Sequence, residues 1–290
     1  MSEQQIAVIG AGTMGRGIAQ TALSAGFPVV LQDVAEKACE QARDAIEVGL
    51  ARLVEKGRLT STAHTQALAR LQTTTQLEQA VTIDGAVIEA APESLALKIE
   101  LFTELGHQAR PTTLLASNTS SISLTRLARA AGAAAPRVVG LHFFNPVPLM
   151  RPVEIIRAEQ TSDTTVERVE ALARDLGKDP VAVADTPGFA VNRLLVPMIN
   201  EAIFLYQEQG ASAADIDQAM KLGAGHPMGP LTLADTIGLD VCLSIMEQLH
   251  EGFGDPKYRP CPLLRRMVDA GYLGRKSGRG FHDYQSPEGV

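Results

Sequence analysis

Short apolar runs alternate with amphipathic helical patterns along the first half of the chain. Helical patterns at residues 14–25, 95–108, 124–131 and 166–176 separate runs that are typical of buried strands. This alternation predicts βαβ units and therefore a doubly wound, Rossmann-type sheet. The predicted strands are residues 6–9, 29–32, 86–89, 114–116, 138–141, 153–157 and 181–183.

A longer helical stretch interrupts this alternation after the second predicted strand. Residues 34–58 and residues 62–71 both show helical patterns. Together they are longer than a plain crossover between two parallel strands, which usually holds one helix. We therefore expect a helical hairpin that protrudes from the sheet.

The pattern changes at the segment Asp185-Thr186-Pro187-Gly188. Beyond it, helical patterns follow one another with little strand character, and Pro-Gly punctuation is typical of a domain boundary. We predict a doubly wound domain over residues 1–185 and an all-helical domain over residues 186–290. The helical patterns of the second domain are residues 190–209, 212–221, 231–251 and 262–270.

Composition and charge narrow the classes of function. The 290 residues carry a net charge of -7, and no basic face is evident, so a nucleic-acid partner is not expected. The apolar run at residues 6–9 leaves no room for a targeting peptide, and no run approaches the ~20 residues of a membrane span. Cys39, Cys242 and Cys261 lie far apart and are interpreted as free thiols, which favours a cytoplasmic location.

A glycine-rich turn, Gly10-Ala11-Gly12-Thr13-Met14-Gly15, follows the first predicted strand and opens a helix. Gly10 permits the tight turn, Gly12 lets backbone approach a pyrophosphate, and Gly15 allows close packing of helix and strand. Asp33 closes the second strand, where a carboxylate binds ribose hydroxyls and repels a 2′-phosphate. The pattern therefore predicts NAD rather than NADP. A glycine-rich turn in an unrelated α/β protein, or an FAD-binding fold, is the alternative.

One histidine stands directly after a predicted strand, at the sheet edge where ligands of such folds bind. A turn centred near Pro148 places His142 opposite Glu154 on the following strand. An imidazole that is oriented by a carboxylate is a suitable acid–base catalyst for an alcohol dehydrogenation. The alternative is a partly buried polar residue that ends a strand. No second His or Cys stands at ligand spacing, so no metal is expected.

Several longer motifs follow one another along nearly the whole chain. They are residues 10–17, 116–121 (ASNTSS), 141–146 (LHFFNP), 185–193 (DTPGFAVNR), 220–230 (MKLGAGHPMGP) and 274–281 (GRKSGRGF). In sequence and in order, these motifs resemble those of the L-3-hydroxyacyl-CoA dehydrogenases, and most of all those of the short bacterial 3-hydroxybutyryl-CoA dehydrogenases.

The resemblance implies a reversible, NAD-dependent oxidation of a short-chain (S)-3-hydroxyacyl-CoA to the 3-ketoacyl-CoA. It implies that His142 and Glu154 are the acid–base pair, and that Ser120 and Asn192 hydrogen-bond the reacting oxygen and the thioester. Because Asn192 follows the predicted boundary, both domains are expected to complete the active site.

The resemblance also implies cofactor and partner contacts. Besides the glycine-rich turn and Asp33, the residues expected to contact NAD are Glu93, Lys98, Asn118, Ser120, Asn145 and Lys276. Arg52 and Lys56, on the helical hairpin with Arg58, are candidates for the CoA phosphates, although a solvated basic face would look the same. The C-terminal domain is expected to bind substrate and to form a homodimer.

Two alternative functions stay open at this stage. One is an NAD-dependent dehydrogenase of a free hydroxy or sugar acid, similar to L-gulonate 3-dehydrogenase. The other is a protein that has kept NAD binding and lost its chemistry. Arg151-Pro152 and Pro92 depart from the family pattern, which leaves the acyl-chain preference open.

Overall fold

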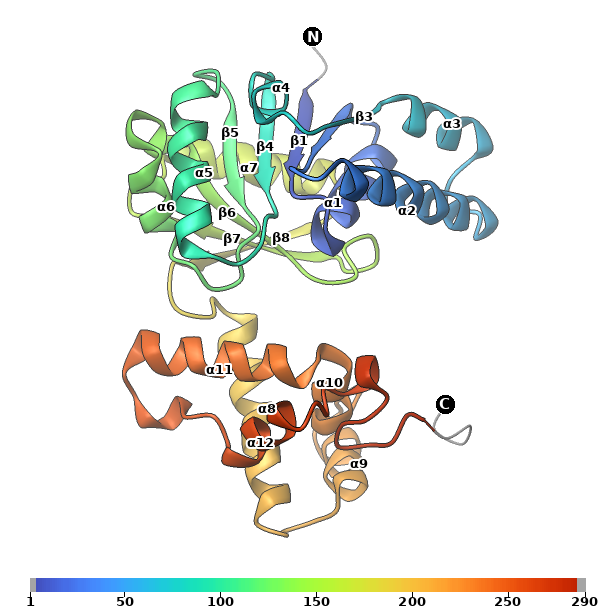
Figure 1. The fold of residues 1–290 in the computed structure, drawn as a ribbon, viewed down its shortest axis with the longest axis vertical. Coiled ribbons are helices and arrows are strands. Elements are labelled where there is room, and N and C mark those ends of the chain that lie inside the picture. Colours follow the sequence, from blue (N-terminus) through green and yellow to red (C-terminus); the bar gives the residue numbers. More distant parts are fainter. Residues whose placement is uncertain (1–3, 286–290) are drawn as a thin grey trace. The chain divides into compact units, whose positions relative to one another are not determined.

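The computed structural model describes residues 4–285, and the chain divides into two compact units, residues 1–186 and 187–290 (Figure 1). The first unit contains the sheet and the second is built on helices. Across the described residues, no helix combines the length and the apolar character that a membrane span requires.

An eight-stranded sheet forms the centre of the first unit, in the order β3-β2-β1-β4-β5-β6-β7-β8. Neighbouring strands are parallel except β6 and β7, which are antiparallel. The predicted doubly wound fold is confirmed. From β1 the chain adds β2 and β3 on one side and then β4 to β8 on the other, so the switch point of the sheet lies between β1 and β4. The strands are β1 Gln5–Ile9, β2 Val29–Gln32, β3 Leu71–Thr74, β4 Gly85–Glu89, β5 Leu114–Ser117, β6 Val138–Phe143, β7 Pro152–Arg157 and β8 Asp179–Ala184.

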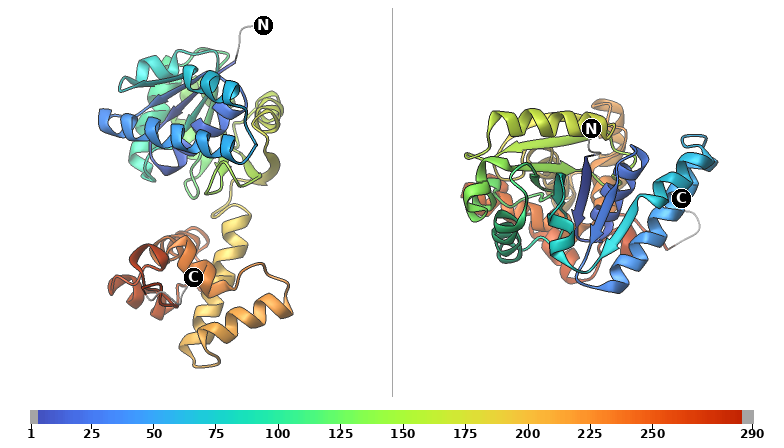
Figure 2. Two further views of the ribbon diagram at one scale, coloured as in Figure 1. Left: turned by 90° about the vertical axis from the view of Figure 1, so that its right-hand side faces the viewer. Right: turned by 90° about the horizontal axis from the view of Figure 1, so that it is seen from above.

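Helices cover both faces of the sheet, which explains why its inner strands consist largely of continuous apolar runs. Ile6 and Val8 face a core shared with α1, α2 and α7, while the opposite face lies under α5 and α6 (Figure 2). The helices are α1 Thr13–Ser24, α2 Glu36–Glu55, α3 Ser61–Ala69, α4 Leu77–Val81, α5 Leu95–Gln108, α6 Leu124–Ala130 and α7 Asp163–Asp175, and a 3-10 helix spans Gly132–Arg137.

The predicted helical hairpin is present as α2 and α3, but the sequence-based prediction missed the strand that follows it. Helix α3 ends at Ala69, and Leu71–Thr74 forms β3, which pairs with β2 through Val29 and Leu71. Only Leu71 of this edge strand is both apolar and buried. A four-residue strand with three polar residues leaves no apolar run to detect, so tertiary pairing alone defines it.

The second unit packs five helices around one apolar core that includes Ile199, Leu231 and Met246. The prediction of a single helix over residues 231–251 is wrong in one respect, because the structure has two helices there, joined at Gly238. That glycine has φ +105, a conformation that ends one helix and begins the next. The helices are α8 Val191–Gln207, α9 Ala213–Gly223, α10 Pro230–Ile237, α11 Leu239–Phe253 and α12 Pro262–Asp269.

Candidate functional site

The glycine-rich turn joins β1 to α1 at the carboxyl edge of the sheet. Gly10 has φ +101, and a Cβ there would lie 2.6 Å from the carbonyl oxygen of Ala90. A Cβ on Gly15 would overlap the carbonyl oxygen of Gly10. A Cβ on Gly12, by contrast, would meet nothing within 4 Å. Two glycines therefore permit close packing, and the third leaves open space at the start of α1.

Gly12 is also the N-cap residue of α1, and no N-cap side chain accepts a hydrogen bond from the first-turn amides. The first-turn amides of a helix carry partial positive charge and attract anions. Open space beside uncapped amides is what a dinucleotide pyrophosphate requires. The local structure at this turn therefore fits NAD.

Asp33 follows β2 and lies beside the glycine-rich turn. Its Oδ2 accepts a hydrogen bond from the Ala11 amide at 2.8 Å, and its Oδ1 accepts one from the Ala35 amide at 3.1 Å. These two bonds orient a half-buried carboxylate next to the start of α1. The orientation suits an acceptor of ribose hydroxyl protons.

His142 and Glu154 are directly paired across the antiparallel strands β6 and β7, as the turn near Pro148 predicted. The imidazole Nδ1 lies 2.7 Å from Glu154 Oε2. Both side chains are buried, and the ring of Phe144 packs against the imidazole with a centroid distance of 4.8 Å. The hydrogen bond to the buried carboxylate orients the ring and fixes which of its nitrogens faces Glu154.

A buried ion pair joins the ends of β4 and β5 to α5. Lys98 is 1% exposed, and its Nζ donates to Glu89 Oε1 at 2.5 Å and to the Ala91 carbonyl at 3.2 Å. The other oxygen of Glu89 accepts from Ser117 Oγ at 2.6 Å. Charges this deeply buried persist only when they are paired and hydrogen-bonded.

Glu93 continues this network into the loop after β5. Its Oε2 lies 3.3 Å from Lys98 Nζ, and its Oε1 accepts from the Ser120 amide at 3.0 Å and from the Thr119 and Ser121 hydroxyls. Burial opposes ionisation, but the Lys98 ammonium and these hydrogen bonds outweigh it and hold the pKa of Glu93 below its ordinary value. The network thereby orders the backbone at Ser120.

Asn118 connects the ends of two neighbouring strands. It follows β5, and its Oδ1 accepts a hydrogen bond from the Phe143 amide at 2.9 Å. Phe143 is the last residue of β6 and follows His142. Asn118 therefore ties the loop that contains Ser120 to the strand that contains the histidine.

A groove of about 600 Å³ lies between α1, α2 and the loop after β6. It brings together Thr13, Asn145, Arg52 and Lys56, all of which were predicted to contact a ligand. Its lining also includes Arg58, which the sequence analysis placed on the same hairpin, Arg16, which it did not single out, and a single carboxylate, Asp44. The charge of the groove favours a polyanionic ligand, although the chain as a whole is acidic.

The remaining predicted residues lie in the second unit. Asn192 is the second residue of α8, and Lys276 lies in a 3-10 turn, Arg275–Ser277. The Lys276 ammonium is 2.5 Å from Asp240 Oδ1 and 2.6 Å from Oδ2, at the start of α11. Lys276 is therefore held on the surface of its own unit.

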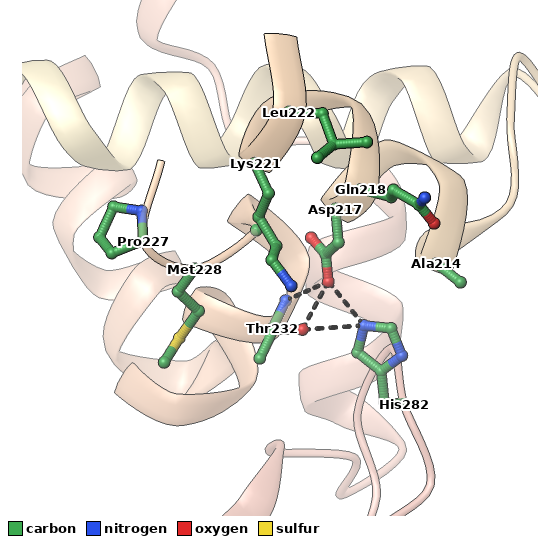
Figure 3. A pocket seen from close by; sticks show the side chains of 10 residues that line it. Ala214, Asp217, Gln218, Lys221, Leu222, Pro227, Met228, Thr232 and His282 are labelled. Carbon is green, nitrogen blue, oxygen red and sulfur yellow. Dashed lines mark hydrogen bonds and ion pairs between the residues drawn. The ribbon is translucent and has the colours of Figure 1, made fainter. Parts of the chain in front are cut away.

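The second unit also has a hollow of about 550 Å³ beside α9 and α10 (Figure 3). The buried carboxylate of Asp217 accepts hydrogen bonds from the amides of Leu231 and Thr232 and lies 2.8 Å from His282 Nε2. These contacts cap α10 and attach the C-terminal segment, which also contains Lys276. Because Asp217 bonds to Leu231, Thr232 and His282 of its own unit, we interpret it as structural.

Sequence reasoning placed polar residues, Glu89 among them, at the carboxyl ends of the strands, but it assigned no role to Glu89 and did not single out Arg16. Glu89 ends an otherwise apolar strand, and this single charge was a signal that could have revealed the buried network. Arg16 gave no such signal, because a basic residue on a helix is usually solvated. Within residues 4–285, no three potential metal-ligating side chains gather in one place.

Comparisons with known proteins agree over both units. The model of the 3-hydroxyacyl-CoA dehydrogenase NAD binding domain matches residues 5–186, and that of the C-terminal domain of the same enzymes matches residues 188–284. The chain is 53% identical over 285 residues to a probable 3-hydroxybutyryl-CoA dehydrogenase of Bacillus subtilis, covering 98% of this chain and 99% of that one. A 3-hydroxybutyryl-CoA dehydrogenase of Bradyrhizobium diazoefficiens is 50% identical over 287 residues, covering 99% and 97% of the two chains.

Solved structures give the same result. The (S)-3-hydroxybutyryl-CoA dehydrogenase of Ralstonia eutropha superimposes with a TM-score of 0.93 at 48% identity, covering 98% of this chain and all of that one. A diketoreductase structure is more distant, with a TM-score of 0.85 and 30% identity, covering 98% of this chain and 100% of that chain.

The charge of Glu93 should stabilise the fold in a pH-dependent way. Because the folded-state pKa is lowered, its contribution is present above the ordinary value of 4.5 and is lost as pH falls through the folded value. We expect Glu93→Gln to lower the free energy of unfolding by about 1 kcal/mol at pH 7, a modest loss because the side chain is partly exposed. Urea denaturation at pH 7 and at successively lower pH measures this difference, with the exposed Glu100→Gln as the control. A difference that stays constant down to acid pH would contradict the assignment.

Proposed function

This chain belongs to the 3-hydroxyacyl-CoA dehydrogenase family, and from that premise we propose that it interconverts a short-chain (S)-3-hydroxyacyl-CoA, such as 3-hydroxybutyryl-CoA, and the 3-ketoacyl-CoA. Membership makes it an NAD-dependent oxidoreductase that acts on a CH–OH group. The observation that carries the chemical proposal is the 2.7 Å contact between His142 and Glu154.

We propose that His142 is the acid–base catalyst and that Glu154 orients it. With Nδ1 bonded to Glu154, Nε2 exchanges the proton with the substrate. In the oxidation it accepts the hydroxyl proton, and in the reduction it returns a proton to the keto oxygen. The buried carboxylate stabilises the imidazolium that forms. Bound NAD supplies the hydride acceptor.

The proposed cofactor contacts lie along the carboxyl edge of the sheet. The first turn of α1, with Gly12, Thr13 and Met14, would hold the pyrophosphate, and Asp33 the adenosine ribose. Glu93, Asn118, Ser120 and Asn145 are proposed to line the remainder of the site, and Lys276 is also proposed to contact NAD. Since Lys98 is buried and bonded to Glu89, we propose that it acts by holding Glu93.

The substrate is proposed to bind through two sets of residues. Ser120 and Asn192 are proposed to hydrogen-bond the reacting oxygen and the thioester. Arg52 and Lys56 are proposed to hold the CoA phosphates, supported by their position in the same groove as Arg16. Four cations and one carboxylate among the groove-lining side chains support a polyphosphate ligand over a small free acid.

Two further proposals concern the oligomeric state and the cellular location of the enzyme. A homodimer through the second unit is supported by large apolar side chains that this unit exposes, Leu194 at 75% and Leu222 at 77%. A cytoplasmic location is supported by three buried free cysteines, which are typical of a reducing compartment.

Two glycines of the turn should respond differently to substitution by alanine. Gly12→Ala meets open space and should leave the melting temperature within about 2 °C, while its methyl group obstructs the pyrophosphate and weakens NADH binding at least tenfold. Gly15→Ala meets the backbone of Gly10 and should destabilise the fold by about 1–3 kcal/mol. Thermal unfolding and NADH fluorescence titration measure the two effects. Normal NADH affinity in a folded Gly12→Ala variant would refute the placement of the pyrophosphate.

The basic groove predicts that the enzyme discriminates between an acyl-CoA and a free hydroxy or keto acid. Acetoacetyl-CoA should be reduced efficiently, and free acetoacetate or an L-gulonate substrate should be turned over at least 10²-fold less efficiently. Arg52→Ala with Lys56→Ala should raise KM for acetoacetyl-CoA about tenfold and weaken its salt dependence, because two screened charges are removed. Absorbance at 340 nm measures both effects, because NADH is consumed when a keto substrate is reduced and formed when L-gulonate is oxidised. Equal use of the free acid would instead support the alternative dehydrogenase class.

Removal of the imidazole should greatly reduce turnover and leave cofactor binding nearly unchanged. His142→Gln keeps a polar side chain and removes the transferable proton, so kcat should fall about 10²–10⁴-fold. Glu154→Gln should lower kcat less, because the imidazole stays but loses the carboxylate that orients it. The NADH dissociation constant should change less than threefold in both variants. Near-normal turnover by a folded His142→Gln enzyme would overturn the acid–base role.

A further inference from the structure

Lys178 is a buried lysine that has no part in the proposed reaction. It lies in the turn between α7 and β8 and is 6% exposed. Its own backbone is fixed by a hydrogen bond from its amide to the Ala173 carbonyl at 2.9 Å. Burial lowers the pKa of its ammonium, and among the described residues no charged partner contributes to that shift. Burying an ammonium is unfavourable unless its donors are satisfied.

The donors of Lys178 converge on one loop. Its Nζ donates to the Val147 carbonyl at 2.5 Å and to the Met150 carbonyl at 2.8 Å. Both carbonyls belong to residues 144–151, which join β6 to β7. The loop closes its own turn through the Leu149 and Met150 amides, which donate to the Pro146 carbonyl. The Lys178 ammonium therefore links the backbone of Val147 to that of Met150 within this turn.

The same loop forms one wall of the basic groove. Residues 145–149 all line it, opposite the cations of α2. Val147 is 2% exposed and packs against α1, where a Cβ on Gly17 would lie 3.0 Å from Val147 Cβ. The position of this wall relative to α1 and α2 therefore depends on the path of the loop backbone, which Lys178 contacts at two points.

His142 and Glu154 lie within β6 and β7, and the ladder between those strands sets their register. Phe144, which packs against the imidazole, precedes the two loop residues that Lys178 contacts. A change in the loop would therefore alter the groove wall and leave the acid–base pair in place. This separation gives Lys178 a distinct kinetic signature.

We propose that Lys178 is a positioning residue for substrate binding, which holds the segment Val147–Met150 as a wall of the groove that takes the nucleotide part of acyl-CoA. The proposal rests on the function proposed above for that groove. Lys178 touches neither substrate nor cofactor and acts through two loop carbonyls. Its loss should weaken binding of the CoA moiety and leave the chemical step intact.

The test compares two substrates with the same reacting group, acetoacetyl-CoA and acetoacetyl-N-acetylcysteamine, which lacks the nucleotide. In Lys178→Met, which keeps the stem and removes the donors, KM for acetoacetyl-CoA should rise about tenfold and kcat should change less than twofold. For the truncated thioester, kcat/KM should stay within twofold of wild type. Lys178→Arg keeps a cationic donor and should restore KM to within threefold. Lys257→Met removes a lysine whose side chain is 63% exposed and should match wild type in every assay.

Two results would overturn the proposal. One is an unchanged KM for acetoacetyl-CoA in folded Lys178→Met, and the other is an equal loss on both substrates, which indicates a general structural role. If Lys178→Met does not fold, Lys178→Gln, which keeps one donor group, is judged by the same comparison. Failure of both variants to fold also counts against the proposal, because it places Lys178 in the stability of the whole unit.

Failure of the underlying function gives a different result. If the wild-type enzyme uses the truncated thioester as well as acetoacetyl-CoA, the groove does not bind the nucleotide, and the proposed function of the groove is wrong. If the wild type prefers acetoacetyl-CoA and Lys178→Met keeps that preference, only the role of Lys178 is wrong.

Discussion

Parallel strands that end at one edge of the sheet are the constraint on which the candidate site depends. The glycine-rich turn follows β1, Asp33 follows β2, Glu93 follows β4, and Ser120 follows β5. These residues are far apart in the chain and meet because their strands point the same way. The antiparallel return of β7 then adds Glu154 opposite His142. The reversal of direction at this one strand supplies the carboxylate that orients the proposed catalyst.

Buried charges hold the loops at this edge in place. The ammonium of Lys98 joins Glu89 and Glu93, and through Glu93 it orders the backbone at Ser120. On the other side of the unit, Lys178 donates to two carbonyls of the loop after β6. Such contacts are unfavourable to build and strongly directional once built, because a displaced partner leaves a charge without compensation. They suit loops that must keep one conformation beside a ligand.

The charge of the groove differs from that of the whole protein. The chain has a net charge of -7, yet Arg16, Arg52, Lys56 and Arg58 gather at one groove with a single carboxylate. Local arrangement therefore decides which ligand the surface attracts. This arrangement supports an acyl-CoA substrate, whose phosphates are distant from the reacting carbon. For the same reason, we expect that substitutions can alter substrate binding and chemistry separately.

Most of the fold followed from the sequence, because apolar runs and glycine-rich punctuation are local signals. Seven strands, the α2–α3 hairpin and the Asp33 position were all visible in the pattern. Two elements were not. The edge strand β3 has one buried apolar residue, and its pairing with β2 decides its conformation. Gly238 lies inside an apolar helical pattern, and its positive φ, which divides α10 from α11, is seen only in the folded chain.

The sequence by itself therefore determined the family, the doubly wound sheet, the cofactor and the pairing of His142 with Glu154, since each depends on spacing or on a continuous motif. Only the tertiary structure decided which groups the ammonium ions of Lys98 and Lys178 contact. Both look like surface lysines in the sequence, because a lysine usually remains in water. Only the fold surrounds them with carboxylates or carbonyls, and burial then converts a solvated charge into a fixed support for the loops of the site.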